Sequence, residues 1–250
     1  MQKDSSHTDW SQPPDTLDFQ PHQVDVWRIK LDLSPATVKS LESTLSAEEA
    51  QRAGRFRFPI DRERYIVAHG CLRSILARYL QCNPEELSFN TNEYGKPTTE
   101  GYKLEFNLSH SGAYVLVAIT QAHKVGIDVE KIRSDMEIES MASRFFSPTE
   151  AAELRALPPE QRKLAFFNCW TRKEAYIKAQ GLGLSLPLDS FDVSLAPNEP
   201  AILRATRPDT EEASRWTLFS LEVDPHHAAA LAAEGQGLNL RLWDWNTSIQ

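Results

Sequence analysis

Two acidic residues, Asp128 and Glu130, lie two positions apart in the segment GIDVEK. On a β-strand, residues two apart project from the same face, so both carboxylates would point the same way. Close carboxylates repel each other unless a cation lies between them, and a hard divalent ion such as Mg²⁺ prefers oxygen ligands. A solvated acidic pair on a sheet surface is the common alternative. The flanking Val125, Ile127 and Val129 would anchor the opposite face in a core, which holds the acidic face in place.

A second group of reactive residues lies in the segment WTRKEAYIKAQGLGLSLPLDSF. Trp170, Glu174 and Lys178 follow an i, i+4, i+8 pattern and share one helix face, while Lys173 is offset from it. The plain interpretation is a surface Glu174–Lys178 ion pair, worth only about 0.3–0.5 kcal/mol. A large aromatic residue on the same face indicates partial burial, and a partly buried glutamate needs a partner. A metal ion shared with the GIDVEK carboxylates would be such a partner.

Basic residues gather in the segment RAGRFRFPIDRER, although the formal net charge of the chain is −8. The segment holds five arginines: Arg52, Arg55, Arg57, Arg62 and Arg64. The overall charge argues against an electrostatic nucleic-acid binder, so an anionic ligand would have to be held by a local cluster. Arginine binds phosphate bidentately, which makes this segment a candidate anion site, with a solvated basic face as the alternative. The turn NEYGKP adds Lys96 on a Gly–Lys–Pro corner.

The segment NLSHSG places Ser109 beside His110 between two strand-like runs. A nucleophilic serine with a histidine base is one interpretation, but neighbouring residues in a strand point to opposite faces. The two residues are better interpreted as hydrogen-bond or charge partners of a polar ligand. Together, these segments predict a divalent metal on three carboxylates with Lys and Arg groups around it, which suits a phosphate or pyrophosphate.

Length and composition are those of an ordinary soluble protein. The 250 residues are 41% apolar and 25% charged, enough for one large domain or two small ones. Three cysteines without a C-x-x-C pair favour a reducing cytoplasm over a disulfide framework or a zinc site. The apolar run AYVLVAIT is too short to span a bilayer, and the polar N-terminus lacks the apolar core of a signal peptide. We therefore expect a cytoplasmic protein that does not insert in a membrane.

The elements that must position these residues follow from periodicity and capping signals. Residues 61–81 and 160–180 have the apolar spacing of long helices, and Gly181 ends the second one. Shorter helices are expected after three serines that act as N-caps, Ser34, Ser46 and Ser147. A further short helix is expected over residues 136–146. Strand-like patterns, some interrupted by turns, cover the segments 24–33, 87–99, 104–112, 113–120, 124–133, 191–196, 216–223 and 239–245.

The order of these elements is similar in the two halves of the chain. Each half offers a strand, a helical stretch, a long helix and then further strands, which suggests a duplicated α+β subdomain. No residue-level repeat supports this, and a single mixed domain is the alternative. The expected organisation is a flexible N-terminal arm (1–22), an N-terminal α/β subdomain (23–122) and a C-terminal α/β subdomain with a tail (123–250).

The segments NLSHSG, GIDVEK, WTRKEAYIKAQGLGLSLPL and YGKP together resemble those of the 4′-phosphopantetheinyl transferases. The likeness is greatest to the long, surfactin-synthetase-activating type. The family pattern is G-(I/V)-D-(I/V)-E, followed downstream by W-x-x-K-E-x-x-x-K. In this chain the two parts are Gly126–Glu130 and Trp170–Lys178, within a likeness that spans residues 46–195.

The resemblance implies an α+β fold in which two similar α/β subdomains form a pseudo-dimer and hold coenzyme A at their junction. It implies transfer of the phosphopantetheine arm of coenzyme A to a serine of an apo acyl or peptidyl carrier protein, with release of 3′,5′-ADP. The carriers would belong to fatty-acid, polyketide or nonribosomal peptide synthases. The expected metal is Mg²⁺, with Mn²⁺ as an alternative, and the expected state is a monomer.

The resemblance also assigns roles to individual residues. Asp128, Glu130 and Glu174 match the Mg²⁺-binding acids, and Glu174 or a metal-bound water is the candidate for deprotonating the incoming serine. Lys178 matches the lysine on the pyrophosphate side. The remaining matches are coenzyme A contacts: Lys96, Ser109, His110 at the 3′-phosphate, Arg64 near the nucleotide, and Arg52 where the family has a lysine.

Two other functions remain open at this point. D…E-x-x-x-K groupings also build metal-dependent nucleases; the net charge of −8 argues against this, and metal-dependent cleavage of DNA or RNA would favour it. A non-catalytic protein that binds coenzyme A or a carrier is the second alternative, and binding without turnover would favour it. A carrier-docking surface could involve the arginine-rich segment or residues 136–146, and the sequence does not rank them.

Overall fold

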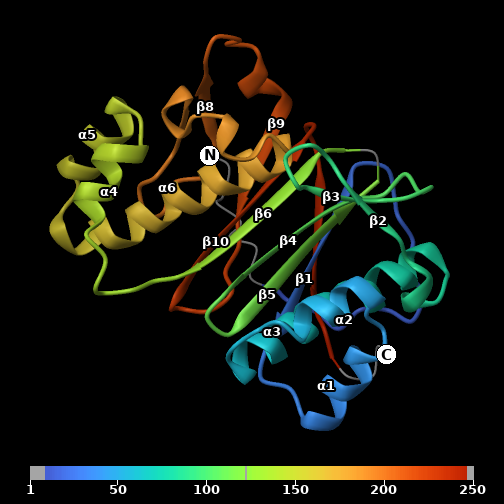
Figure 1. Ribbon diagram of the computed structural model, residues 1–250. Helices are drawn as coiled ribbons and strands as arrows, with labels where there is room; N and C mark the ends of the chain where they lie inside the picture. The colour runs from blue at the N-terminus through green and yellow to red at the C-terminus, as the bar shows by residue number, and fades with distance from the viewer. Residues whose placement is uncertain (1–8, 122, 247–250) are drawn as a thin grey trace.

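The computed structural model describes residues 9–121 and 123–246 and has a mixed α+β fold (Figure 1). Its strands are β1 (Gln23–Lys30), β2 (Phe89–Thr91), β3 (Pro97–Thr99), β4 (Glu105–Ser111), β5 (Tyr114–Thr120), β6 (Val125–Lys131), β7 (Phe191–Val193), β8 (Leu203–Thr206), β9 (Trp216–Ser220), β10 (His227–Glu234) and β11 (Asn239–Asp244). One main sheet has the order β11-β1-β5-β4 and the other β6-β10-β9, and the pairs β2-β3 and β7-β8 are separate hairpins.

The helices fall into two long ones and several short ones. They are α1 (Pro35–Glu42), α2 (Ala47–Ala53), α3 (Pro59–Leu80), α4 (Ile138–Phe145), α5 (Pro148–Ala156) and α6 (Pro159–Gln180), with 3₁₀ turns at Pro84–Glu86, Gly183–Ser185, Leu188–Ser190 and Glu212–Arg215. Within residues 9–121 and 123–246, none of the helices is both long and apolar enough to cross a membrane.

The predicted capping signals are confirmed by hydrogen bonds at the helix ends. The Ser34 hydroxyl accepts from the Thr37 amide, and Ser46 and Ser147 each form a reciprocal capping box with the glutamate three residues later. These bonds satisfy amide groups that the first turn of a helix leaves without a partner. Gly181 follows α6 with φ of 69°, a left-handed conformation that glycine adopts without strain.

Three apolar cores separate the layers of the molecule. On one outer side, α1 and α3 pack against the β11-β1-β5-β4 sheet through residues such as Trp27, Ile75 and Val117. The two sheets face each other across a second core. On the other outer side, α6 packs against the β6-β10-β9 sheet, with Phe166 and Ala230 in the third core. Figure 1 accordingly shows α3 and α6 on opposite sides of the strands.

The sequence pattern does not predict strands β8 or β10. The segment of β10, HAAALAAE, consists mainly of good helix formers. In the structure its alternate residues enter two different cores: Ala230 and Ala232 face α6, while Leu231 and Ala233 face the other sheet. A buried central strand needs small side chains where layers approach closely, and this tertiary requirement overrides local propensity.

The two halves repeat the same order of elements. Strand β1 is followed by two short helices, the 22-residue α3 and further strands, and β6 is followed by α4, α5, the 22-residue α6 and further strands. The last strand, β11, returns to pair in parallel with β1. This pairing places a strand of the second half in the sheet of the first half. The exact subdomain boundaries and the pseudo-dimer therefore stay predictions.

Part of the predicted N-terminal arm is described by the structure. Residues 1–8 lie outside the described residues. Ser11 forms a β-bridge with Trp243, and the Trp10 indole donates a hydrogen bond to the Glu222 carbonyl at 2.7 Å. These contacts attach residues 10 and 11 to the body of the protein.

Gly126 explains how β6 can lie directly on α6. A Cβ atom at this position would be 2.1 Å from the Ala175 carbonyl oxygen and 2.3 Å from the Ala179 amide nitrogen. Both neighbours belong to the helix backbone, which cannot rotate away as a side chain would. Glycine at the start of GIDVEK therefore sets the distance at which Asp128 and Glu130 face the helix.

We expect Gly126→Ala to lower the free energy of unfolding by about 1–3 kcal/mol, because the added methyl group must push β6 off α6. Urea denaturation measures this change. The matched control is Gly54→Ala, because Gly54 has φ of −67° and its added Cβ would come no closer than 3.5 Å to its neighbours. The control should keep the stability of the wild type or raise it by up to about 1 kcal/mol, because alanine at a compatible position restricts the unfolded chain. Equal stability of Gly126→Ala and the wild type would contradict the proposed spacing role.

Candidate active site

Strand β6 presents its acidic residues to α6. Val125, Ile127 and Val129 are buried in the core between the sheets, so Asp128 and Glu130 occupy the opposite face. This confirms the alternation predicted for GIDVEK. Asp128 is only 3% exposed, whereas Glu130 is partly exposed.

Helix α6 presents Trp170, Glu174 and Lys178 as one stripe. All three are partly exposed, while the residues between Trp170 and Glu174, and between Glu174 and Lys178, are buried. The predicted shared face is therefore present. Trp170 packs on the rings of Phe145 and Phe166, with centroid distances of 5.7 and 6.1 Å, which fits a packing residue.

Asp128 is the point at which β4, β6 and α6 meet. The Lys178 ammonium donates to Asp128 Oδ1 at 2.6 Å, and the Ser109 hydroxyl donates to the same oxygen at 2.9 Å. Lys178 also contacts Ser109 Oγ at 3.0 Å. The hydrogen bonds of Lys178 thus run to β6 and β4, in place of the simple Glu174–Lys178 surface pair that the helix spacing alone allowed.

The three carboxylates lie in an environment that disfavours their charged forms. Burial raises the pKa of Asp128, although Lys178 and Ser109 oppose the shift. Burial and the charge of Asp128 raise the pKa of Glu130. Burial, followed by the charges of Asp128 and Glu130, raises the pKa of Glu174 against the opposing effect of Lys178. The negative charges are therefore close enough to repel one another, as the sequence predicted.

These carboxylates do not form a ready-made metal cage. In the part of the chain that the structure describes, no group of three or more His, Cys, Asp or Glu side chains is arranged to hold a metal ion. The chemistry of the donors nevertheless fits a hard cation, because they are carboxylate oxygens whose charged forms burial disfavours. Asp128 Oδ2 is also buried without a hydrogen-bond partner, an arrangement that costs free energy unless a cation or donor reaches it.

A group of basic residues adjoins the carboxylates on the α3 side. His110 is exposed on the face of β4 opposite to Ser109, as strand alternation predicts. Partial burial and the nearby positive charges of Lys178, His69 and Arg64 lower the pKa of His110. The structure thus brings His110, Arg64 and Lys178 into one electrostatic neighbourhood.

Arg52 reaches the same side of the molecule through an aromatic contact. Its guanidinium lies over the Tyr65 ring, 5.6 Å from the centroid, and Tyr65 in turn stacks on His69 at 4.1 Å. Glu49 ties α2 to α3 through Arg73 at 2.6 Å and through His69. Although burial alone would raise the pKa of Glu49, hydrogen bonds from His69, the Ser46 amide and Arg73 lower it to about 2.

Two family descriptions match the chain. The 4′-phosphopantetheinyl transferase superfamily matches residues 124–232, and the N-terminal part of 4′-phosphopantetheinyl transferase matches residues 32–122. The 4′-phosphopantetheinyl transferase HetI of Nostoc sp. (strain PCC 7120) is 39% identical over 243 residues, which cover 96% of this chain and 99% of HetI. The 4′-phosphopantetheinyl transferase Sfp of Bacillus subtilis (strain 168) is 36% identical over 214 residues, which cover 84% of this chain and 92% of Sfp.

This chain belongs to the 4′-phosphopantetheinyl transferase superfamily. It is a transferase of the Sfp-like type, which confirms the resemblance seen in the sequence. Membership in a family of transferases also decides against the nuclease and the non-catalytic alternatives. A further relative, the phosphopantetheinyl transferase of Thraustochytrium sp. (strain ATCC 26185 / S-3), is 28% identical over 233 residues, which cover 86% of this chain and 80% of that protein.

In the transferase, Lys96 has a structural role that the sequence did not predict. Its ammonium donates to the Val125 carbonyl at 3.0 Å and to the Ala179 carbonyl at 3.1 Å, at the start of β6 and the last turn of α6. A cation suits a helix C-terminus, where carbonyl groups lack intrahelical partners. Burial lowers the pKa of Lys96. The contact of Lys96 with coenzyme A stays a prediction.

Lys173 lies beside the site residues in the sequence, but it is a buried structural residue. Its side chain is fully buried and forms an ion pair with Glu150 at 2.8 Å. It also donates to the Leu188 and Phe191 carbonyl oxygens, each at 2.7 Å, so all three ammonium protons have acceptors. The helical spacing in the sequence predicts only that Lys173 lies off the face that carries Glu174. The distant partners could not be identified from local sequence.

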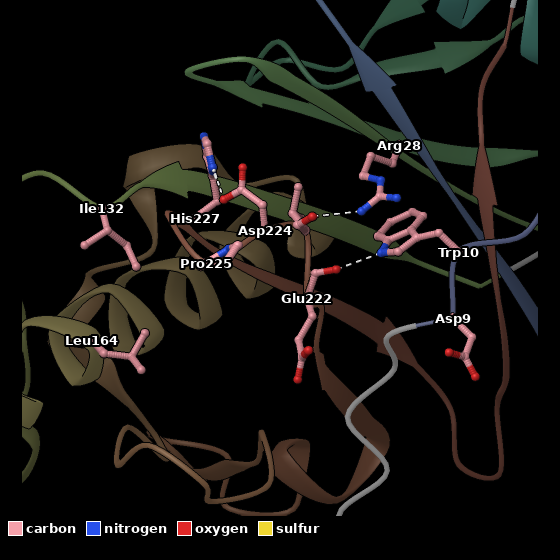
Figure 2. A pocket seen from close by; sticks show the side chains of 10 residues that line it. Asp9, Trp10, Arg28, Ile132, Leu164, Glu222, Asp224, Pro225 and His227 are labelled. Carbon is pink, nitrogen blue, oxygen red and sulfur yellow. Dashed lines mark hydrogen bonds and ion pairs between the residues drawn. The ribbon is translucent and has the colours of Figure 1, made fainter.

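A cleft of about 630 Å³ lies elsewhere, between the N-terminal residues and the β9–β10 connection (Figure 2). Arg28, Trp10 and Glu222 line one part of it, and Asp224 and His227 line another. Arg28 is engaged by Asp244 at 2.8 Å and by the Val223 carbonyl. None of the predicted site residues lines this cleft. The candidate active site, where β4, β6 and α6 meet at Asp128, is therefore a separate region.

We expect Lys173→Met to lower the free energy of unfolding by about 3–5 kcal/mol, because it leaves the buried Glu150 carboxylate without its cation. Methionine keeps the length of the side chain, so the change tests charge more than volume. Lys163→Met, at an exposed position of the same helix, is the control and should stay within about 0.5 kcal/mol of the wild type. Urea unfolding followed by tryptophan fluorescence measures both. A small effect of Lys173→Met would assign this lysine a role other than stabilisation.

Proposed function

We propose that the transferase moves the 4′-phosphopantetheine arm of coenzyme A to a serine of an apo acyl or peptidyl carrier protein, in an Mg²⁺-dependent reaction that releases 3′,5′-ADP. Family membership supports the class of reaction. The observation that carries the proposal is the meeting of buried Asp128 with Lys178, beside Glu130 and Glu174. This arrangement supports the proposal because the proposed metal ligands and the proposed phosphate-binding cation then lie in one place.

Asp128, Glu130 and Glu174 would hold the metal ion in this proposal. Their oxygen donors suit Mg²⁺, and Mn²⁺ could replace it. When bound, the ion would neutralise negative charge on the pyrophosphate of coenzyme A. The raised pKa values of the three side chains support this assignment, since a nearby cation would stabilise the charged forms that burial disfavours.

The protein groups then act on the two ends of the reacting bond. The serine oxygen of the carrier forms a bond to the phosphorus that carries pantetheine, and the phosphorus–oxygen bond to the nucleotide phosphate breaks. Glu174 accepts the serine proton, a role that a carboxylate beside the reacting atoms can fill as a general base. Lys178 stabilises the negative charge of the departing nucleotide phosphate.

The basic residues on the α3 side would bind the nucleotide end of coenzyme A. His110 would contact the 3′-phosphate, with Arg64 beside it and Arg52 further along the same face. Arginine and lysine give charge-assisted hydrogen bonds to phosphate, and a local cluster can do so in an acidic protein. Ser109 and Lys96 are also proposed as contacts, in addition to the internal bonds that they already make.

We further propose that residues 23–122 and 123–250 form two similar subdomains with coenzyme A at their junction. The shared order of elements supports this, and the hydrogen bonds to Asp128 join β4 of one half to β6 and α6 of the other. We propose a monomeric enzyme of the cytoplasm. The free thiols of Cys71, Cys82 and Cys169 are in keeping with a reducing compartment.

The central test is transfer to a carrier in vitro. Coenzyme A, Mg²⁺ and an apo carrier protein should give a carrier heavier by one phosphopantetheine in intact-mass measurement. A carrier with its modifiable serine changed to alanine, and a reaction with excess chelator, should both remain unmodified. Absence of a mass shift over carriers from fatty-acid, polyketide and peptide synthases would refute the proposed substrates.

Glu174→Gln should lower kcat by about 10²–10⁴-fold, because the amide can neither accept the serine proton nor bind a cation as a carboxylate does. Glu130→Gln should also lose turnover. The fold should survive in both, since glutamine has a similar size and burial disfavours the charge that is removed. Glu160→Gln, at an exposed position of α6, is the matched control and should keep wild-type kcat. Near-native rates in either site variant would remove that residue from the proposed metal site.

A further inference from the structure

Strands β4 and β6 are joined by side chains of β4. The two strands belong to different sheets, and each forms an edge of its own sheet. Alternate residues of β4 accept hydrogen bonds from alternate backbone amides of β6. The Ile127 amide donates to Asn107 Oδ1 at 2.9 Å, the Val129 amide to Ser109 Oγ at 3.4 Å, and the Lys131 amide to Ser111 Oγ at 3.0 Å. We call Asn107, Ser109 and Ser111 the seam residues.

The two serines of the seam have a second function that Asn107 lacks. The Ser109 hydroxyl donates to Asp128 Oδ1 at 2.9 Å, and the Ser111 hydroxyl donates to Glu130 Oε2 at 3.0 Å. A serine hydroxyl has one proton to donate and two lone pairs to accept with, so one side chain can serve a carboxylate and an amide together. The two serines of β4, spaced two residues apart, thus pair one to one with the two acidic residues of β6, which have the same spacing.

Glu130 depends on this match more than Asp128 does. Asp128 is held by both Ser109 and Lys178. Among the described residues, Glu130 accepts its side-chain hydrogen bond from Ser111. Glu130 is also less buried than Asp128, so packing restricts its rotamers less. The direction of its carboxylate therefore rests on the Ser111 hydroxyl.

We propose that Ser111 is a positioning residue that acts through Glu130, holding its carboxylate in the direction required for metal binding. This inference rests on the proposed function, because it assumes that Glu130 is a metal ligand. Groups that orient metal ligands typically change metal affinity by about 10–100-fold when they are removed. Ser111 itself need not touch the metal, coenzyme A or the carrier.

The test compares three variants by calorimetric titration with MgCl₂ in the presence of coenzyme A and without a carrier, so that no turnover occurs. Ser111→Ala should raise the dissociation constant for Mg²⁺ by about 10-fold or more. Ser111→Thr keeps the hydroxyl and should stay within about 3-fold of the wild type. Asn107→Ala removes a seam bond without removing a bond to a carboxylate, so it should lower stability with a smaller change in Mg²⁺ affinity.

Steady-state kinetics with a carrier provide a second readout. Ser111→Ala should raise the Mg²⁺ concentration needed for half-maximal rate, and saturating Mg²⁺ should restore most of kcat. Thermal unfolding of each variant shows whether the fold is kept. If Ser111→Ala does not fold, Ser111→Cys replaces it, since a thiol has a similar size and is a weaker hydrogen-bond donor.

The possible results separate this inference from the proposed function. Equal Mg²⁺ dissociation constants for the wild type and Ser111→Ala, in an active wild-type enzyme, would overturn the positioning role alone. A comparable loss of affinity in Asn107→Ala would also overturn it, because the effect would then come from a loosened seam. Failure of the wild type to bind Mg²⁺ would overturn both the metal assignment and the role of Ser111. Failure of transfer to every carrier, with Mg²⁺ binding intact, would overturn the proposed substrates and leave the positioning role standing.

Discussion

The burial of the Asp128 carboxylate is the constraint on which the rest of the site depends. An ionised carboxylate taken out of water is costly unless it is paired and hydrogen-bonded. Its partners, Ser109 and Lys178, come from β4 and α6, so three elements must meet at one oxygen atom. Gly126 makes this possible, because any side chain there would hold β6 away from α6. The hydrogen bonds to this carboxylate thus form where the two halves of the chain adjoin.

Local signals in the sequence predict much of the fold because they have local causes. Ser46 and Ser147 cap helices through residues three positions away, and α3 and α6 lie close to their predicted ranges. Strand β10 lacks such a signal. Its alanines are set by the close approach of α6 on one face and of the second sheet on the other, and neither neighbour adjoins it in the sequence. The parallel pairing of β11 with β1 is equally remote from local patterns.

The site follows the same division between local and remote causes. Spacing predicts that Asp128 and Glu130 share a strand face and that Glu174 and Lys178 share a helix face. It does not predict the partners of the lysines, because a long flexible side chain can reach several elements. Lys178 bonds to Asp128, Lys173 to Glu150, and Lys96 to the carbonyl of Ala179. Residue type and spacing therefore indicate a chemistry, while tertiary contacts decide which charges carry it.

The side-chain seam between β4 and β6 also solves a problem of edge strands. An edge strand exposes backbone amides that can pair with another chain, and proteins commonly cover or disrupt such edges. A full backbone ladder between β4 and β6 would merge the two sheets into one. It would then leave less freedom for the sheets to face each other across their shared core. Side-chain acceptors satisfy the β6 amides at a wider spacing, and in two of the three positions the same hydroxyl also orients an acidic side chain. The interaction that closes the edge is therefore also the one that arranges the carboxylates.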